Sequence, residues 1–582
     1  MSRNDEVARL LEEFADLLDA KDVAYKPSSY RRAAENVREY PTPIEELAAD
    51  GADAVEEIDR VGDAISSKIV EYFETGHIEE LDDLREELPV DMAGLTSVEG
   101  VGPKTVGKLY DALGVTDLDE LEAAARDGKI QELKGFGAKT EANILDGIEF
   151  AREATGRETL GKARPIADDL LAYLRESDAV GRAEPAGSMR RWRETVGDID
   201  ILVASDDPEA VIDHFLASDL VADTIEAGAQ KASIRVDAMR VDLRVIDSTE
   251  YGAALQYFTG SKDHNVHLRN IAIDRGLKMN EYGMFDISDV ADAESGPRVG
   301  TRVAGETEES MYAALDLPLI PPEMREDTGE IQAATDGTLP TLIEEGEIRG
   351  DLHTHTVWSD GNNTIAEMVA AAEERGYEYH VVSDHATGPG MVGGVGVEDD
   401  ELLEQVDEVR AVAADADITV FTGVEANIDA EGGISVADEV LDELDVVVAS
   451  PHSALDQDRE TATERLVRAM EHPAVDILGH PTGRLINQRP GLPVDYERLA
   501  AAAVENGVAL ELNASPYRLD LNGEALKIAV EAGAPIAIDT DAHRPAGLDQ
   551  IRYGIHTARR GWVEAADVVN TWPVEDLTDF LH

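Results

Sequence analysis

The apolar positions of the N-terminal segment recur at the spacing of a helix that buries one face. That face is predicted to hold Val7, Leu10, Leu11, Phe14, Leu17 and Leu18. Three similar units follow at 58–62, 98–102 and 133–137, and the last glycine of each opens an amphipathic helix. These glycines, Gly62, Gly102 and Gly137, lie 40 and 35 residues apart, which is typical of an internal repeat. We therefore expect two helical hairpin regions, at 1–90 and 91–150.

Strand patterns begin near residue 180 and give way to a second helical stretch. Residues 198–203 and 240–246 have the pattern of strands, and helical spacing resumes over 251–276. The Pro-rich segment 316–325 then predicts a domain exit, and the polar, glycine-containing stretch after it predicts a linker over 321–345. The pattern indicates an α+β domain at 151–260 and a smaller domain at 261–320.

Short apolar strands alternate with helices from residue 346 to the end of the chain. Seven strands are predicted, near 349–355, 379–384, 418–424, 446–450, 475–479, 508–513 and 535–539. Strands that alternate with helices favour a parallel sheet, and seven of them suggest barrel-like closure. We therefore expect a distorted (β/α)7 barrel over 346–582, with its chemistry at the carboxyl ends of the strands.

The formal net charge of the chain indicates the environment in which the protein works. The 582 residues include 51 Lys+Arg and 122 Asp+Glu, a formal net charge of −71. Such an excess of surface carboxylates suggests a halophilic cytosol and argues against attraction to a membrane. The net negative charge also disfavours binding of nucleic acid by the chain as a whole. However, 12 of the 13 lysines lie in residues 1–278, so the two halves of the chain differ in their content of positive charge.

The absence of cysteine excludes several kinds of site. Disulfides, iron–sulfur clusters and thiolate zinc sites are ruled out, so any metal must be held by His, Asp or Glu. The charged N-terminus does not have the pattern of a signal peptide, and no run of 18 apolar residues occurs. We expect a cytoplasmic protein with no membrane partner.

Two of the hairpin units combine a glycine turn with a lysine. A Gly-x-Gly turn that opens a helix lets backbone N–H groups approach a phosphate. The candidate DNA-binding residues are Gly100, Gly102 and Lys104, and Gly135, Gly137 and Lys139. The alternative is a tight turn between packed helices, but three spaced units favour contacts to a DNA backbone.

Carboxylates on two predicted strands form the first candidate catalytic set. Asp198 and Asp200 lie two residues apart on one strand face, and Asp242 lies on the second strand. Three convergent carboxylates suit two Mg²⁺ ions that activate a hydroxyl and stabilise a leaving phosphate. The alternative is a set of solvated carboxylates at a sheet edge. Gly187 and Ser188, just upstream, favour catalysis because they suit a nearby phosphate.

Histidines and carboxylates at predicted strand ends form the second set. Its nine members are His353, His355, Asp360, His385, Glu425, His452, His480, Asp541 and His543. Nine N and O ligands at one barrel mouth predict a multinuclear centre of up to three ions, and imidazole-rich sites suit Mn²⁺ or Zn²⁺. His380, His472, His556 and His582 have no such placement and are interpreted as ordinary residues.

The order of these motifs over residues 1 to about 320 closely resembles the family X DNA polymerases, the polymerase beta group. Hairpins, Gly187-Ser188, the Asp-x-Asp pair, the third Asp and Tyr257-Phe-x-Gly260 occur in the family's order. The resemblance implies a palm at 151–260, a thumb at 261–320, and two palm metals held by Asp198, Asp200 and Asp242. It also implies nucleotide contacts by Gly187, Ser188, Arg191, Gly197, Tyr257, Phe258, Gly260, Asn265 and Arg269.

Residues 346–582 resemble the PHP phosphoesterase domain that follows many bacterial and archaeal family X polymerases. All nine ligand positions are filled. The resemblance implies a 3′→5′ exonuclease, with 3′-phosphatase or abasic endonuclease action as alternatives. Arg484 follows the ligand His480 and is interpreted either as a contact to substrate phosphate or as a surface arginine.

Lys68 lies six residues after Gly62, where the resembled family carries a lysine that forms a Schiff base with an abasic sugar. The chemistry requires a partly deprotonated amine. Ala64 replaces a phosphate-binding lysine and Arg60 replaces the first hairpin glycine, so an exposed helix lysine is the alternative.

Together the motifs predict a monomeric repair enzyme that fills gapped or nicked DNA from deoxynucleoside triphosphates and trims 3′ ends. One rival is a template-independent nucleotidyltransferase fused to a small-molecule phosphatase, which would need no hairpins to hold DNA. The other is a DNA-binding scaffold with an inactive PHP module, which would need no complete metal sets.

Overall fold

The computed structural model describes residues 3–23, 26–40, 43–58, 60–98, 100–154, 157–237, 239–293, 295–391 and 395–581. The chain divides into two compact units, residues 1–156 with 487–490, and residues 157–486 with 491–582. Among the described residues, no helix combines the length and the apolar character that a bilayer crossing requires.

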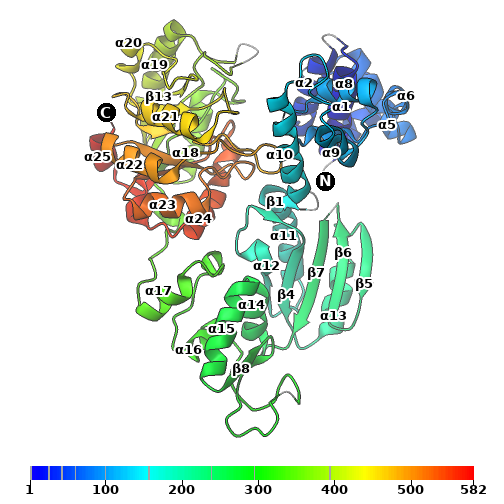
Figure 1. Ribbon diagram of the computed structural model, residues 1–582, viewed down its shortest axis with the longest axis vertical. Coiled ribbons are helices and arrows are strands. Elements are labelled where there is room, and N and C mark those ends of the chain that lie inside the picture. Colours follow the sequence, from blue (N-terminus) through cyan, green and yellow to red (C-terminus); the bar gives the residue numbers. More distant parts are fainter. Residues whose placement is uncertain are drawn as a thin grey trace. The chain divides into compact units, whose positions relative to one another are not determined.

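The first unit is built from helices (Figure 1). They pack around one apolar core. Phe14 and Tyr30 stack in this core with ring centroids 4.5 Å apart. The helices are α1 (Arg3–Ala20), α2 (Lys26–Glu39), α3 (Ile44–Asp50), α4 (Ala52–Val55), α5 (Asp63–Thr75), α6 (Glu79–Glu87), α7 (Met92–Thr96), α8 (Pro103–Leu113), α9 (Leu118–Arg126) and α10 (Ala138–Ala154). As predicted, α5, α8 and α10 begin directly after the three repeat glycines.

Residues 158–259 lie in the predicted palm, called the palm region below, and contain a five-stranded sheet in the order β2-β4-β7-β6-β5. Strands β4 and β7 are parallel, and the other neighbours are antiparallel. Its elements are β1 (Glu158–Thr159), α11 (Leu160–Arg175), β2 (Arg182–Pro185), α12 (Gly187–Arg190), β3 (Thr195–Val196), β4 (Ile199–Ala204), α13 (Pro208–Leu216), β5 (Asp223–Ala227), β6 (Lys231–Val236), β7 (Met239–Ile246) and α14 (Tyr251–Thr259). Strand β4 is buried on both faces. Ile201 and Val203 pack in the cluster that includes α11 and α13, whereas Leu202 and Ala204 pack in the cluster that includes α14.

The region that follows holds a three-stranded antiparallel sheet, with the order β10-β9-β8, and several helices. Its elements are α15 (Lys262–Asp274), β8 (Leu277–Asn280), β9 (Gly283–Asp286), β10 (Thr301–Ala304), α16 (Glu308–Ala313), the short 3-10 helices η1 (Pro322–Met324) and η2 (Glu345–Glu347), and α17 (Glu330–Asp336) between them. The stretch expected to be a free linker is therefore partly helical, and Met324, Ile331 and Ala334 belong to the same apolar core as α15 and α16.

The C-terminal region is a seven-stranded parallel sheet in which every strand pairs with its neighbour in chain order. The strands are β11 (Gly350–Asp351), β12 (Tyr379–Val382), β13 (Thr419–Asn427), β14 (Val446–Ser450), β15 (Ile477–Leu478), β16 (Ala509–Asn513) and β17 (Ile536–Asp539). A parallel bridge between Thr354 and Ala542 joins the segments that follow the first and last strands, so the barrel is nearly closed. The seven predicted strands are confirmed. However, β11 ends at Asp351, so His353 and His355 follow the strand instead of lying within it.

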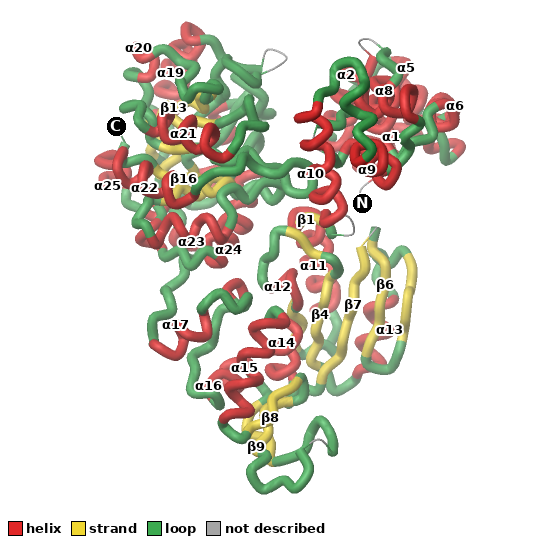
Figure 2. Tube along the Cα trace, viewed as in Figure 1, coloured by secondary structure: helices red, strands yellow, loops and turns green. Residues whose placement is uncertain are grey.

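Helices surround this barrel (Figure 2). They are α18 (Ile365–Glu374), α19 (Asp399–Ala413), α20 (Asp438–Leu441), α21 (Arg459–Met470), α22 (Tyr496–Asn506), α23 (Gly523–Glu531), α24 (Ile551–Arg560) and α25 (Val574–Phe580), with short 3-10 helices η3 (Pro545–Gln550), η4 (Ala565–Asp567) and η5 (Val569–Thr571).

Helix α24 of the barrel packs directly against the palm region. The His556 ring stacks on Trp192 with centroids 3.6 Å apart, and the Arg164 guanidinium lies 4.3 Å from the same indole. Glu323 of η1 accepts hydrogen bonds from His556 at 2.7 Å and from Arg559 at 2.8 Å. These residues come from the palm region, from η1 and from α24 of the barrel. Specific polar contacts, as well as apolar packing, therefore connect these three parts of the second unit.

We expect Glu323→Gln to lower the free energy of unfolding of the second unit by about 3 kcal/mol, because it leaves the mostly buried Arg559 guanidinium without its carboxylate. Burial raises the pKa of Glu323, but His556 and Arg559 lower it from 4.5 to about 2. The stabilisation should therefore be complete above pH 4.5 and disappear as the pH falls toward 2. Denaturant unfolding at several pH values would measure it. Glu531→Gln, an exposed change in α23, is the control, and equal losses in both variants would contradict the prediction.

Candidate functional site

The palm carboxylates lie on two paired strands. Asp200 of β4 is in direct parallel register with Asp242 of β7, and Asp198 stands immediately before β4. Burial and the charges of Asp198 and Asp242 raise the pKa of Asp200 to about 6. Such mutual repulsion is relieved by a cation, so these three side chains suit a site for hard divalent metals.

Asp242 is held in place by side chains of its own sheet. It accepts hydrogen bonds from the Ser233 hydroxyl and, at 3.0 Å, from the Arg240 guanidinium. Burial raises the pKa of Asp242, but these bonds lower it below its usual value overall. The Asp242 carboxylate is therefore ionised near neutral pH and fixed in orientation.

The predicted phosphate-binding turn lies against these carboxylates. Gly187 has a φ of +59°, and a Cβ at this position would lie 2.6 Å from an Asp200 carboxylate oxygen. Only glycine fits both the backbone conformation and the space. The turn therefore brings Ser188, at the start of α12, close to the predicted metal site.

The two arginines that follow are engaged within the protein. Arg191 donates to Glu326 at 3.0 Å and to the Thr259 carbonyl at 2.7 Å, whereas Arg190 forms a bidentate pair with Glu308. Arg191 was predicted to contact the nucleotide's phosphates. In this structure it reaches Glu326, so nucleotide binding by Arg191 would require exchange of that partner.

The other predicted nucleotide contacts gather at the turn between α14 and α15. Tyr257 and Phe258 pack edge to face at 5.1 Å, and Asn265 donates to the Tyr257 carbonyl at 2.7 Å. A Cβ at Gly260 would lie 2.6 Å from the Asn265 side-chain oxygen. Two predicted residues lie elsewhere: Gly197 lies between β3 and β4, and Arg269 is exposed on α15.

The hairpin glycines adopt the backbone conformation that the motif requires. Gly100 and Gly135 have φ values of +78° and +98°, and Gly102 and Gly137 directly precede α8 and α10. In the first repeat Arg60 takes the same left-handed region, with a φ of +62°.

The two hairpin lysines lie at the starts of the helices that these turns open. Lys104 on α8 lies 3.5 Å from Asp22 and 3.9 Å from Asp19, and its side chain is 60% exposed. Lys139 follows the first residue of α10.

Lys68 is neither a fully exposed lysine nor a deprotonated one. Its ammonium lies 2.8 Å from Glu80, and the side chain is 14% exposed. Burial lowers the pKa of Lys68, but Glu80 and Tyr30 raise it above its usual value overall. This environment opposes the free amine that a Schiff base needs.

We expect Glu80→Gln to lower the pKa of Lys68 and to increase several-fold the yield of a borohydride-trapped adduct with abasic DNA at pH 7. Gel analysis of the trapped complex measures the yield, and Lys68→Ala is the control that should give none. An adduct that persists in Lys68→Ala, or that Glu80→Gln leaves unchanged, would remove Lys68 from consideration as the lyase nucleophile.

The nine predicted ligands of the barrel converge at its carboxyl-terminal mouth. Glu425, at the end of β13, lies 2.5 Å from His385, 2.9 Å from His480 and 3.2 Å from His452. On the other side Asp541 lies 3.0 Å from His355. The remaining contacts connect all nine residues into one cluster.

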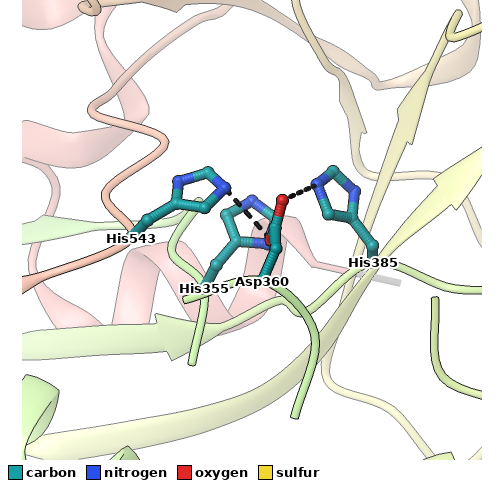
Figure 3. Close-up of side chains that lie close together, drawn as sticks. All are labelled: His355, Asp360, His385 and His543. Carbon is teal, nitrogen blue, oxygen red and sulfur yellow. Dashed lines mark ion pairs between the residues drawn. The ribbon is translucent and has the colours of Figure 1, made fainter. Parts of the chain in front are cut away.

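Asp360 links two of these histidines at the rim of the cluster (Figure 3). Its oxygens lie 3.1 Å from His543 and 3.6 Å from His385. In Figure 3 the His355 ring lies between the rings of these two histidines. Burial raises the pKa of Asp360, but the two histidines lower it far below its usual value overall.

The cluster has the properties of a metal site. Three overlapping ligand groups occur: His355, Asp360, His385 and His543; His353, His355 and Glu425; and His385, Glu425 and His452. Several of their buried atoms, including His353 Nε2, His385 Nδ1, Glu425 Oε2 and Asp541 Oδ1, have no hydrogen-bond partner. Buried polar atoms are rarely left unsatisfied, so this donor set fits divalent ions.

Two residues that the sequence did not reveal hold ligand histidines in orientation. Glu511 of β16 pairs with His353 Nδ1 at 2.6 Å, and the Asn427 side-chain oxygen lies 2.7 Å from His452 Nδ1. Each contact leaves Nε2 of that histidine for a metal. The only sequence signal for Glu511 was a carboxylate inside a mainly apolar barrel strand.

Arg484, one predicted phosphate contact, is engaged elsewhere. It donates to Glu194 at 2.8 Å and to the Leu519 carbonyl at 2.6 Å. The side chain is 13% exposed, so Arg484 is not a surface arginine, and a contact to substrate phosphate would require exchange of these partners. It joins the barrel to the palm region.

We expect Glu511→Gln to weaken metal binding by the barrel about 10- to 100-fold, because it disturbs the orientation and basicity of His353. Metal content after dialysis against a chelator, measured by mass spectrometry, tests this. Glu505→Gln on the exposed face of α22 is the matched control. Retention of the full metal content by Glu511→Gln would show that His353 needs no such support.

Comparison with known proteins gives matches along most of the chain. Family models match as a helix-hairpin-helix domain at 2–78, a SAM-like helix-hairpin-helix tandem at 92–149, a DNA polymerase beta thumb at 254–326 and a PHP domain at 351–515. The DNA polymerase/3'-5' exonuclease PolX of Bacillus subtilis is 36% identical over 581 residues, which is 99% of each chain.

Other relatives match only part of the chain. A probable phosphatase of Shewanella sp. (strain MR-4) is 33% identical over 204 residues, which is 33% of this chain and 75% of that protein. A probable phosphatase of Caldanaerobacter subterraneus is 35% identical over 205 residues, with the same coverage. The full-length match and the polymerase beta thumb together place this chain among the family X DNA polymerases that carry a C-terminal PHP domain.

Proposed function

We propose that this protein extends 3′ ends on gapped or nicked DNA with its palm and trims 3′ ends with its PHP barrel, acting as a monomer. The observation that carries the proposal is the presence of two chemically different ligand sets on separate folds of one chain. One consists of three palm carboxylates, and the other combines six imidazoles with three carboxylates. The full-length similarity to a polymerase/exonuclease supports both activities.

In the palm, Asp198, Asp200 and Asp242 would hold two Mg²⁺ ions, which supply charge neutralisation and an activated 3′-hydroxyl when bound. The Gly187-Ser188 turn would hold the triphosphate, and its proximity to Asp200 supports this role. Tyr257 and the turn that follows it would border the sugar and the nascent base pair. Positioning and charge would provide most of the rate enhancement, because phosphoryl transfer requires little covalent help from the protein.

In the barrel, the nine ligands would hold up to three Mn²⁺ or Zn²⁺ ions, which supply a nucleophilic hydroxide when bound. Glu425 and Asp541 would each contribute a carboxylate to these ions. Burial raises the pKa of each carboxyl, but the adjacent histidines lower it well below its usual value overall. Both carboxylates are therefore ionised and ready to bind cations at neutral pH.

A phosphatase acting on small molecules is the second candidate for the barrel, because the partial relatives are named probable phosphatases. Those matches cover about a third of this chain. The hairpin units support a DNA substrate instead, since a small phosphoester needs no backbone-binding turns.

Two double variants test the two-site proposal on one gapped DNA labelled at the primer 5′ end. We expect His353→Ala with His355→Ala to reduce 3′ trimming at least 100-fold while primer extension in Mg²⁺ continues. We expect Asp198→Ala with Asp200→Ala to abolish extension and leave trimming in Mn²⁺ intact. Gel electrophoresis resolves the longer and shorter products in one reaction.

The reciprocal pattern is the critical result, because each double variant is the control for the other. Trimming that survives loss of the two histidines, or disappears with the two palm aspartates, would contradict the separation of sites. Release of phosphate from a small phosphomonoester without shortening of DNA would favour the phosphatase instead.

A further inference from the structure

An arginine that no sequence pattern indicated lies at the edge of the barrel's ligand cluster. Arg518 belongs to the loop between β16 and α23, and its Nε lies 3.9 Å from Asp541 Oδ2. Its side chain is 23% exposed, so it is accessible to a ligand. Among the described residues of the barrel, it is the only arginine or lysine recorded in an ion pair with one of the nine ligands.

The two oxygens of Asp541 face different surroundings. Oδ1 faces the histidines and lies 3.0 Å from His355. Oδ2 accepts a hydrogen bond from Asn513 at 3.0 Å and faces Arg518. Arg518 therefore stands on the side of Asp541 away from His355, beside the ligand cluster and outside it.

The guanidinium of Arg518 has unused hydrogen-bonding capacity. Within the described part of the chain it donates no hydrogen bond, although a guanidinium carries five N–H donors. Its backbone, by contrast, is fixed, because Arg518 N donates to Ser515 O and Ile486 N donates to Tyr517 O, both at 2.8 Å. The donors are thus available from a well-defined position.

Other arginines around the barrel are engaged. Arg465 donates to the carbonyl oxygens of Ile428 and Ser453, and Arg484 donates to Glu194 and the Leu519 carbonyl. These side chains hold loops and the palm contact together. Arg518 has no comparable structural role.

Electrostatics also set Arg518 apart. A positively charged arginine repels divalent ions bound at the neighbouring site. An anion that binds both the arginine and the ions relieves this repulsion. The site's three carboxylates cannot neutralise several divalent ions, so the loaded centre attracts an anion. A planar guanidinium at its edge matches two oxygens of a phosphate group.

We propose that Arg518 is a catalytic residue that binds the non-bridging oxygens of the substrate phosphate at the PHP centre, an inference that rests on the proposed phosphoesterase function. The ligand class is a phosphate ester with at least two free oxygens on phosphorus. Arg518 holds that phosphate against the ligand cluster and stabilises the negative charge that develops on it.

The experiment uses the full chain loaded with Mn²⁺ and compares Arg518→Ala and Arg518→Lys with the wild type. Binding of inorganic phosphate is measured by titration calorimetry, metal content by mass spectrometry, and KM and kcat for 3′ trimming on labelled DNA. Arg498→Ala, an exposed change on α22, is the matched control for loss of one positive charge.

We expect Arg518→Ala to weaken phosphate binding about 10- to 100-fold, the loss associated with charge-assisted hydrogen bonds. KM for trimming should rise, Arg518→Lys should retain part of the affinity, and Arg498→Ala should match the wild type. Metal content and palm-dependent extension should not change.

Two results would overturn the assignment. Phosphate affinity within twofold of the wild type would mean that Arg518 does not contact phosphate. Loss of bound metal would mean that it positions Asp541 instead. A wild type that binds phosphate through Arg518 but trims no DNA would contradict the proposed exonuclease and leave the phosphate site intact.

Discussion

One buried carboxylate organises the C-terminal half of the protein. Glu425 has no exposed surface and lies within 3.7 Å of five imidazoles, those of His353, His355, His385, His452 and His480. A charge in such surroundings is tolerable only with compensating cations or hydrogen bonds. The barrel meets this requirement because parallel strands bring their carboxyl ends to one mouth, where the segments at the ends of β11 to β15 and of β17 carry the ligands.

Much of this arrangement could be predicted, because it follows from the pattern of apolar residues along the chain and from the position of the histidines relative to that pattern. The seven strands were visible as short apolar runs, and the ligands were visible as histidines that follow those runs. Glu511 was not visible, because its role depends on a partner 158 residues away. Local sequence contains no information about which residue a side chain meets across a barrel.

The same limit explains the two arginines whose surroundings differ from expectation. Motif position suggested that Arg191 contacts phosphate and that Arg484 either contacts substrate phosphate or is a surface arginine. Their guanidinium groups, however, reach Glu326 and Glu194, which are 135 and 290 residues distant in sequence. Arg560 of the barrel also donates to Glu326, so one carboxylate is shared between Arg191 and an arginine of the barrel.

The Trp192 stack has a consequence for how this enzyme can be divided. Trp192 directly follows Arg191 and is 7% exposed, with His556 of the barrel against its ring. A polymerase fragment truncated before the barrel would present this indole to water next to its own nucleotide turn, and would invite self-association there. Weak primer extension by such a fragment would then have two causes, the exposure of Trp192 and the loss of the barrel. Point variants in the intact chain are therefore the sounder way to separate the contributions of the two halves.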